Sequence, residues 1–464
     1  TLENVTNAGI IPMIHVDDEA EAEALIAYLN ENMIEDIMII SSDIELLGDI
    51  MAETSGARGI YDASDKESYT QDELEALKVA ANSNDVKIIM LSDTATYENV
   101  KWLQAHLMTV WAYTTGEDVV ANYTVLTNGV DGVLADNYAA VQEALASFEG
   151  TNVLLRVPTI SGHRGSKVTA DGGKIPEVTV DALLQAAAFG ADAVECDLLI
   201  TADGYLVLQH DDTTKRMMSA DLDIKTSTLA ELKELTYKAE YSCDKDGNFV
   251  ERHIETLQEQ FEAFADNKDI IFYLELKEVP EELEDKTVEV LREVIEEYGV
   301  EKQCVVITFD TGLMESMHRL YPELSLGYLG YLTTNTLESV LDMIEPINGT
   351  INPYYGAYGG MHLPLSTYKG LRGQYLRGVT MHGWTINGFA LDEALVVAKS
   401  QSLTTDNTIK IGNWANHIEI GSQEITYRAG GSFKFDAAVI TWLGEEVKGA
   451  EFEIVTIEGN GVQA

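Results

Sequence analysis

The chain has 464 residues, of which 45% are hydrophobic, and a chain of this length is expected to fold as two or three domains. Lysine and arginine number 30 against 78 aspartate and glutamate residues, so the formal net charge is −48. A charge of this sign repels nucleic acid and anionic membrane surfaces, and we interpret the acidity as a solvated surface that keeps the protein soluble.

The cysteines and the apolar stretches exclude further classes. Cys196, Cys243 and Cys304 are too few and too scattered for a disulfide framework or a zinc knuckle. No stretch is long and apolar enough to be expected to span a membrane. The chain begins at Thr1, so we expect a processed or recombinant start, and the lack of a visible signal peptide means little.

Residues 1–150 alternate between short apolar runs and amphipathic segments, which predicts strands and helices in turn. Two segments echo later ones: Asp36-Ile-Met-Ile-Ile-Ser-Ser-Asp43 matches Gln303-Cys-Val-Val-Ile-Thr-Phe-Asp310, and Val110-Trp-Ala-Tyr113 matches Gly383-Trp-Thr-Ile386. This internal repeat indicates that the region shares the architecture of the one that follows. We expect its strands near residues 10–15, 36–41, 58–62, 87–91, 108–113 and 132–135.

The alternation continues from about 150 to 406 and predicts a parallel (β/α)8 barrel with its active groups at the C-terminal ends of the strands. Helices are expected between most strands, for example over 179–189 and 281–298. Residues 1–150 then look like the last six units of a second, divergent barrel, either truncated or incomplete by nature. We expect the barrel strands near residues 159–162, 192–199, 271–276, 304–309, 325–329, 349–352, 379–386 and 402–405.

After Asp406 the pattern changes to polar and apolar residues in alternation with glycine-rich turns, which indicates β-structure. We expect residues 409–464 to form a small sheet or part of an immunoglobulin-like module. By analogy, such an appendage suits a secreted or surface protein of a bacterium. The strands are expected at 417–420, 424–427, 433–435 and 452–454.

Two barrel strands carry charged residues spaced two apart. Glu195 and Asp197 should share one face of their strand, while Val194 and Cys196 point the other way. Glu275 and Lys277 repeat the spacing in the run Ile270-Ile-Phe-Tyr-Leu-Glu-Leu-Lys277 and should also share a face. Buried carboxylates repel each other and lose hydration, so they need a cation or a proton. Glu195, Asp197 and Glu275 together would suit a hard divalent ion such as Ca²⁺ or Mg²⁺.

Basic residues and histidines accompany these carboxylates. Arg164 and Lys277 would suit a phosphate group, since guanidinium and ammonium are its usual partners. His163 and His210 would suit proton transfer near neutral pH. We expect Trp384 to line the site, and His382, two residues earlier, could reach it too.

In order along the chain, these motifs resemble the glycerophosphodiester phosphodiesterase family over residues 155 to 406. One departure is Val178, where the family often has Asn. Gly129-Val-Asp-Gly-Val-Leu-Ala-Asp136 resembles the closing strand of the same family. The matching pieces are His163-Arg-Gly165, Pro176-Glu-Val-Thr179, Gly190-Ala-Asp192, Glu195-Cys-Asp197, Thr201-Ala-Asp-Gly204, His210-Asp211 with Arg216, Leu274-Glu-Leu-Lys277, Thr308-Phe-Asp310, Trp384-Thr-Ile-Asn387 and Thr404-Thr-Asp406.

The resemblance implies a catalytic barrel over 151–408, with an insertion at about 205–256 that caps the site. It implies metal-dependent cleavage of small-molecule glycerophosphodiesters to glycerol 3-phosphate and an alcohol, with His163 and His210 as acid and base. In the family the glycerol 2-hydroxyl is proposed to attack first, which gives a cyclic phosphate that water then opens.

Two alternatives remain open at this point. One is a lyase-type phospholipase D of the same barrel family, acting on lysophospholipid or sphingomyelin. The other is a surface binding module whose active site has decayed. Residues 1–150 lack the paired motifs, so we expect that region to be non-catalytic and its histidines, His15 and His106, to be structural. The oligomeric state is not predicted.

Overall fold

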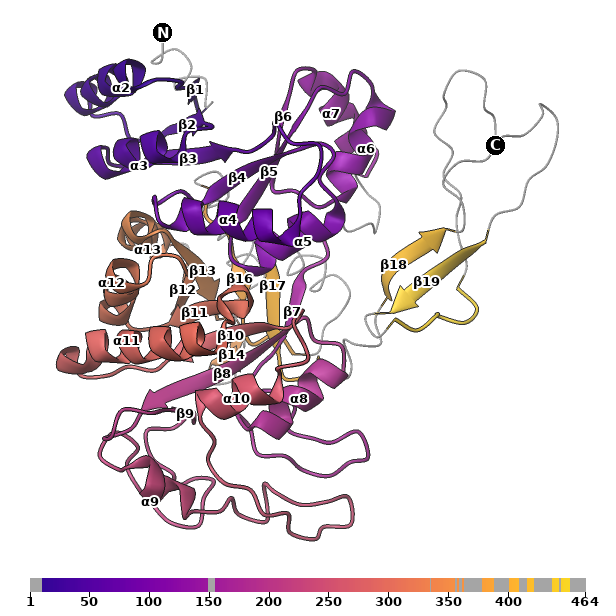
Figure 1. Ribbon diagram of the computed structural model, residues 1–464. Helices are drawn as coiled ribbons and strands as arrows, with labels where there is room; N and C mark the ends of the chain where they lie inside the picture. The colour runs from indigo at the N-terminus through magenta and orange to yellow at the C-terminus, as the bar shows by residue number, and fades with distance from the viewer. Residues whose placement is uncertain are drawn as a thin grey trace.

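The computed structural model describes residues 11–148, 155–333, 335–354, 357–358, 361–362, 378–387, 400–408, 415–420, 436–441 and 444–450. Two α/β units lie one on the other, and a short β-ladder follows near the C-terminus (Figure 1).

Residues 11–148 form one parallel sheet whose six strands pair in chain order from β1 to β6. Each helix of this unit begins at an Asp, Thr or Asn whose side chain accepts a backbone N–H of the first turn, which is the preferred N-cap arrangement. In the described residues β1 and β6 do not pair, so the sheet stays open, and the predicted partial barrel is confirmed. The elements are β1 (Met13–His15), α2 (Glu19–Asn32), β2 (Ile37–Ser41), α3 (Ile44–Glu53), β3 (Ala57–Asp62), α4 (Gln71–Asn82), β4 (Ile88–Ser92), α5 (Tyr97–Ala105), β5 (Thr109–Thr114), α6 (Val119–Thr127), β6 (Gly132–Ala135) and α7 (Tyr138–Ala146).

The second unit is the predicted eight-stranded parallel barrel. Its strands follow the order β13-β12-β11-β10-β8-β7-β17-β16, and β13 meets β16 through the parallel bridges Ile351–Met381 and Tyr354–Trp384. The strands are β7 (Thr159–Gly162), β8 (Ala193–Ile200), β10 (Ile271–Leu276), β11 (Cys304–Thr308), β12 (Leu326–Gly330), β13 (Gly349–Pro353), β16 (His382–Gly383) and β17 (Ser402–Thr405). The helices are α8 (Val180–Ala188), α10 (Leu257–Ala263), α11 (Glu281–Tyr298), α12 (Thr311–Leu320) and α13 (Leu337–Ile344), with 3-10 turns η1 (Glu301–Gln303) and η2 (Glu345–Ile347).

One barrel strand is shorter than the sequence predicts. The apolar run over 379–386 forms a ladder only at His382–Gly383, because Met381 and Trp384 on either side pair with the neighbouring strand by single bridges. Two further strands, β14 (Ala357–Tyr358) and β15 (Met361–His362), form a separate antiparallel pair that the sequence did not predict.

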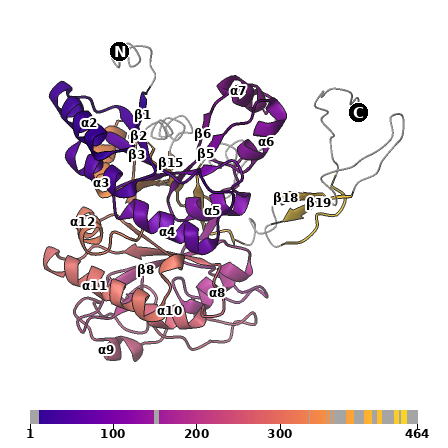
Figure 2. The same ribbon diagram turned by 45° about the horizontal axis from the view of Figure 1, so that its top comes forward.

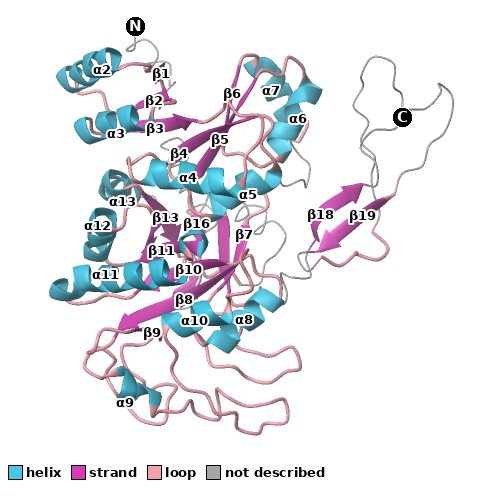
Figure 3. Ribbon diagram, viewed as in Figure 1, coloured by secondary structure: helices cyan, strands magenta, loops and turns pink. Residues whose placement is uncertain are grey.

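The segment from 205 to 256 is mostly loop, as Figure 3 shows, yet it has its own small core. It begins with β9 (Leu206–Leu208), which pairs antiparallel with the far end of β8, and it includes the short helix α9 (Leu229–Lys233). Its core residues are buried together with Leu199 and Val207 and are Met217, Met218, Ile224, Leu232, Leu235, Tyr237 and Ile254.

The first unit covers the end of the barrel that is opposite the C-terminal ends of its strands. Leu107, in the turn between α5 and β5, is fully buried and packs with Tyr273, which lies in β10 on the face that looks into the barrel. The Tyr273 hydroxyl donates to the backbone oxygen of Ala105 at 2.9 Å. His106, which lies between Ala105 and Leu107 in the chain, contacts the backbone oxygen of Lys302 at 2.9 Å through Nε2. Figures 1 and 2 both show α4 and α5 along this border.

Near the C-terminus, β18 (Ala415–Ile420) and β19 (Ala437–Thr441) form an antiparallel ladder. The predicted strand at 417–420 is confirmed, whereas those at 424–427, 433–435 and 452–454 lie outside the described residues. Among the helices that the structure describes, none is both long enough and apolar enough to cross a bilayer.

Candidate active site

Three carboxylates converge inside the barrel because their strands are neighbours in register. Glu275 of β10 lies opposite Asp197 of β8, and Glu195 lies two residues before Asp197 on the same face. One carboxylate oxygen from each residue lies within 4.8 Å of the others, and all three side chains are buried. Val194 and Cys196 point into the helix-facing core, as the alternation predicts. The structure therefore brings the three predicted metal ligands together.

Burial makes this cluster electrostatically costly. It raises the pKa of Glu195 well above its usual value, and the charges of Asp197 and Glu275 raise it further. Burial and the charge of Asp197 likewise raise the pKa of Glu275 to about 7. Burial opposes ionisation of Asp197 too, but Lys277, Arg164 and His210 outweigh it and hold that pKa below its ordinary range. Nearby cations therefore stabilise the ionised form of Asp197, whereas ionisation of Glu195 and Glu275 calls for further positive charge.

These carboxylates fit a divalent cation because their oxygens are suitable ligands and because one of these oxygens has no hydrogen-bond partner within the described part of the chain. Among the described residues, Oε1 of buried Glu195 has no hydrogen-bond partner. A buried carboxylate oxygen without a partner carries a desolvation cost that a bound cation would offset. Three oxygen donors at this spacing are the ligand type that Ca²⁺ and Mg²⁺ prefer.

The His163-Arg164-Gly165 turn brings backbone and side-chain groups to the same cluster. The Arg164 N–H donates to Oε2 of Glu195 at 2.7 Å. Both Arg164 and Gly165 have left-handed backbone angles, with φ values of 58° and 72°. A Cβ on Gly165 would lie 2.4 Å from the backbone carbon of Ala182 in α8, so this position admits only glycine without moving the helix.

Two predicted phosphate contacts are held by the cluster itself. Arg164 Nε lies 3.5 Å from Oδ2 of Asp197, and Lys277 Nζ lies 2.7 Å from Oδ1. Lys277 also pairs with Glu275. Although burial opposes its charge, Asp197 and Glu275 raise the pKa of Lys277, so it remains an ammonium group. The two cations therefore stand beside the carboxylates and present their charge to the same site.

Each predicted catalytic histidine has an aspartate partner on Nδ1. His163 Nδ1 lies 2.9 Å from Asp406, at the end of β17, and His210 Nδ1 lies 2.7 Å from Asp211. In the described part of the chain no hydrogen bond to either Nε2 is found, so that nitrogen is the one available for proton transfer. Burial and the charges of Lys277 and Arg164 lower the pKa of His210 although Asp197 raises it.

The remaining aromatic and histidine expectations divide. Trp384 lies at the same end of the barrel and donates from Nε1 to the backbone oxygen of Asn352. It packs on Phe309 and Tyr354, but in the described residues no hydrogen bond or ring contact joins it to the charged cluster. His382 does not reach the site, because its ring is buried and bonded to Thr380 and Ser402. His106 is buried, and its two ring nitrogens lie within hydrogen-bond distance of the backbone oxygens of Trp102 and Lys302.

Five charged residues lie around the two histidines, and the sequence alone predicted no individual role for any of them. Asp211 could have been found because it follows His210 directly. Lys167 carries no motif signal, and only the folded turn brings it to Asp406 at 2.9 Å. The five residues are Lys167, Glu177, Asp211, Arg216 and Asp406.

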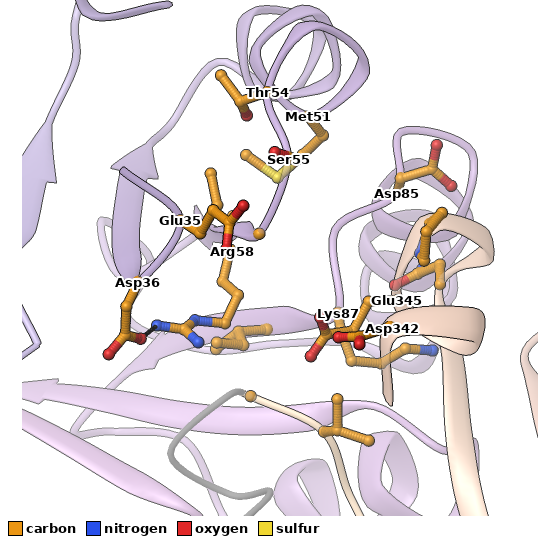
Figure 4. A pocket seen from close by; sticks show the side chains of 18 of the residues that line it. Glu35, Asp36, Met51, Thr54, Ser55, Arg58, Asp85, Lys87, Asp342 and Glu345 are labelled. Carbon is orange, nitrogen blue, oxygen red and sulfur yellow. Dashed lines mark hydrogen bonds and ion pairs between the residues drawn. The ribbon is translucent and has the colours of Figure 1, made fainter. Parts of the chain in front are cut away.

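A cavity of about 1050 Å³ opens elsewhere, where the first unit meets the barrel. Figure 4 shows its charged lining, in which Arg58 is already paired with Asp36 at 2.5 Å. Carboxylates from both units outnumber its cations, and burial lowers the pKa of Lys87 to about 7. None of the active-site cluster lines this cavity, so it is separate from the candidate site.

Known proteins are similar to part of this chain. The glycerophosphodiester phosphodiesterase of Caldanaerobacter subterraneus subsp. tengcongensis is 30% identical over 173 residues, which are 37% of this chain and 65% of that protein, slightly under two thirds. The Bacillus subtilis enzyme of the same name is 25% identical over 244 residues, covering 51% of this chain and 78% of the relative.

Among solved structures, a phosphodiesterase of Oleispira antarctica in complex with the product sn-glycerol-3-phosphate is 24% identical. It superposes with a TM-score of 0.45 over 55% of this chain and 95% of the other. The model of the Glycerophosphoryl diester phosphodiesterase family matches residues 163–410, which is more than half of the chain and contains the predicted site residues. The chain therefore belongs to the glycerophosphoryl diester phosphodiesterase family.

Proposed function

We propose that this protein is a metal-dependent glycerophosphodiester phosphodiesterase that releases glycerol 3-phosphate and an alcohol. The observation that carries the proposal is the pair of aspartate-held histidines at the strand ends, beside a buried cluster of three carboxylates and two cations. Family membership supports the same reaction. A binding module whose active site had decayed would not need to keep this set.

Glu195, Asp197 and Glu275 would hold the divalent cation, Ca²⁺ or Mg²⁺. When bound, the cation would offset the negative charge of the phosphodiester, which otherwise repels a nucleophile. Arg164 and Lys277 contribute to the same end, because both stay charged and both stand at the cluster. They would orient the phosphate with respect to the two histidines.

The histidines would move protons in two steps. In the first, one ring takes the proton of the glycerol 2-hydroxyl as that oxygen bonds to phosphorus, and the other ring protonates the departing alcohol. In the second, water opens the cyclic phosphate with the two roles reversed, which restores both rings. Each Nδ1 is held by its aspartate, so Nε2 is the nitrogen that would act.

A product assay tests the proposal. Glycerophosphocholine and glycerophosphoethanolamine should yield glycerol 3-phosphate, EDTA should abolish turnover, and an analogue lacking the 2-hydroxyl should be cleaved poorly. Full activity in excess chelator from protein free of metal would contradict the metal requirement. Cleavage of the deoxy analogue at the normal rate would contradict the cyclic route, and preference for lysophosphatidylcholine would favour the phospholipase D alternative.

We further propose a division of labour along the chain. Residues 151–408 would be the catalytic barrel, with 205–256 as an insertion that caps the site, and residues 1–150 would be non-catalytic because they lack the paired motifs. Residues 409–464 would form a β-rich appendage of a secreted or cell-surface protein. Fractionating producing cells and probing each fraction for the chain would test this location.

A further inference from the structure

Each histidine–aspartate pair is joined to a cation of its own. Lys167 Nζ lies 2.9 Å from the same Asp406 oxygen that His163 contacts. Arg216 Nε lies 2.5 Å from Asp211, the partner of His210. Asp406 and Asp211 therefore each stand between a histidine ring and a permanent positive charge.

A single carboxylate, Glu177, connects the two cations. Its Oε1 accepts from Arg216 Nη2 at 2.6 Å, and its Oε2 lies 3.7 Å from Lys167 Nζ. The same Oε1 accepts from Arg164 Nη1 at 3.1 Å, and Arg164 forms an ion pair with Asp197. A continuous chain of alternating charges thus runs from His163 to His210 through Glu177.

The surroundings keep Glu177 ionised and in place. Only 10% of its side chain is exposed. Burial alone would raise its pKa, but the hydrogen bond from Arg216 and the charges of Arg164, Arg216 and Lys167 hold that pKa below its ordinary value. The backbone is tied as well, since the N–H of Val178 donates to the oxygen of Arg164 at 3.0 Å and Thr179 caps helix α8.

We propose that Glu177 is a positioning residue that holds both histidine–aspartate pairs in their working geometry, an inference that rests on the proposed function. Glu177 shares Arg216 and Lys167 with the two aspartates. Without its charge, Arg216 and Lys167 would pair more closely with Asp211 and Asp406 and draw those carboxylates away from the imidazole rings. One glutamate would in this way set the orientation of the acid and the base together.

The decisive variant is Glu177→Gln, which keeps the side-chain shape and removes the charge. We expect kcat on glycerophosphocholine to fall roughly 10–100-fold, the range typical of partners that orient active-site groups, with little change in KM. The matched control is Asp181→Asn. Asp181 lies in the first turn of α8, outside the network, and its substitution breaks an ion pair with Arg252. That control should keep its kcat, and both variants should keep their thermal midpoints close to that of the native chain.

Double-mutant cycles separate positioning from a general structural effect. Glu177→Gln should cost less kcat in an Asp211→Asn background, and also in an Asp406→Asn background, because each aspartate variant already releases one ring. Equal penalties in all three backgrounds, or a kcat for Glu177→Gln matching that of Asp181→Asn, would overturn the inference.

A readout without substrate keeps this result distinct from failure of the proposed function. The ring-nitrogen NMR signals of His163 and His210, assigned with the single alanine variants of the full chain, should both move in Glu177→Gln and stay in place in Asp181→Asn. Movement of both signals in a protein that cleaves no glycerophosphodiester would support the coupling and contradict the proposed function. Unmoved signals in an active enzyme would contradict the coupling alone.

Discussion

The two histidines reach the site by different routes, which makes single-residue changes informative. His163 follows β7 directly and is held by Asp406 from the next strand of the barrel, whereas His210 comes from the segment over 205–256 and is held by its own neighbour. Each ring is hydrogen-bonded to a carboxylate that is itself paired with a cation. Loss of either ring should therefore remove one proton-transfer group and leave the other in place.

We expect His163→Ala and His210→Ala each to lower kcat by about 10²–10⁴-fold, the usual contribution of a general acid or base. The double variant should show only background hydrolysis, because residues 11–148 bring no second site together in the structure described. His15→Ala is the control, since that ring is 52% exposed at the end of β1. Steady-state kinetics on glycerophosphocholine measures all four proteins, and near-native kcat in both single variants would contradict the assignment.

Removing one carboxylate should weaken the cation site without unfolding the barrel. Glu195→Gln keeps the oxygen that accepts from the Arg164 N–H and removes the carboxylate charge that Glu195 would offer to a bound cation, so affinity for Ca²⁺ or Mg²⁺ should fall. Isothermal titration calorimetry on chelator-treated protein measures the change. Asp62→Asn, at the end of β3 in the first unit, should leave the affinity unchanged. Equal affinities for the native chain and Glu195→Gln would place the ion elsewhere.

At the scale of elements, the turn between α5 and β5 contributes to the barrel interior although it belongs to the other unit. Leu107 is fully buried among barrel residues. We expect Leu107→Ala to lower the free energy of unfolding by about 2–5 kcal/mol, the cost of truncating a buried leucine. Leu145→Ala, on a 45% exposed side chain of α7, should change it by less than about 0.5 kcal/mol. Urea denaturation compares the two, and equal costs would show that the turn does not support the barrel.

At the scale of the whole molecule, an ion pair joins the units across their border. His318 Nε2 of α12 lies 2.7 Å from Asp85, which follows α4. The hydrogen bond with Asp85, opposed by burial and helped by the aspartate charge, raises the pKa of His318 above 6.5. A raised histidine pKa stabilises the fold fully below the unfolded value, and this stabilisation is lost as the pH rises through the folded value.

The thermal midpoint of the native chain should therefore exceed that of His318→Gln below about pH 6.5, and the difference should shrink as the pH rises above that value. Thermal unfolding of both proteins between about pH 5.5 and 8.5 tests this. A constant difference between the native chain and His318→Gln across the range would mean that the pair does not titrate as proposed.

Local pattern was sufficient wherever a feature depends on neighbours in the chain. The apolar run at 271–276 predicted β10 to the residue, and the two-residue spacing of Glu195 and Asp197 placed both inside the barrel because strand side chains alternate. The predicted strand at 379–386 came out shorter, since pairing depends on what the neighbouring strand offers.

The sequence by itself predicted the barrel, because the periodicity of strands and helices is a local property, and it predicted that Glu195, Asp197 and Glu275 would lie together. Only the tertiary structure decided how the parts meet. Glu177 and Arg216 are 39 positions apart in the chain, yet Arg216 Nη2 lies 2.6 Å from Glu177 Oε1. The packing of Leu107 on Tyr273 of β10 and the pairing of Lys167 with Asp406 likewise join residues far apart in the sequence. Such contacts depend on the packing of whole elements, which no spacing along the chain records.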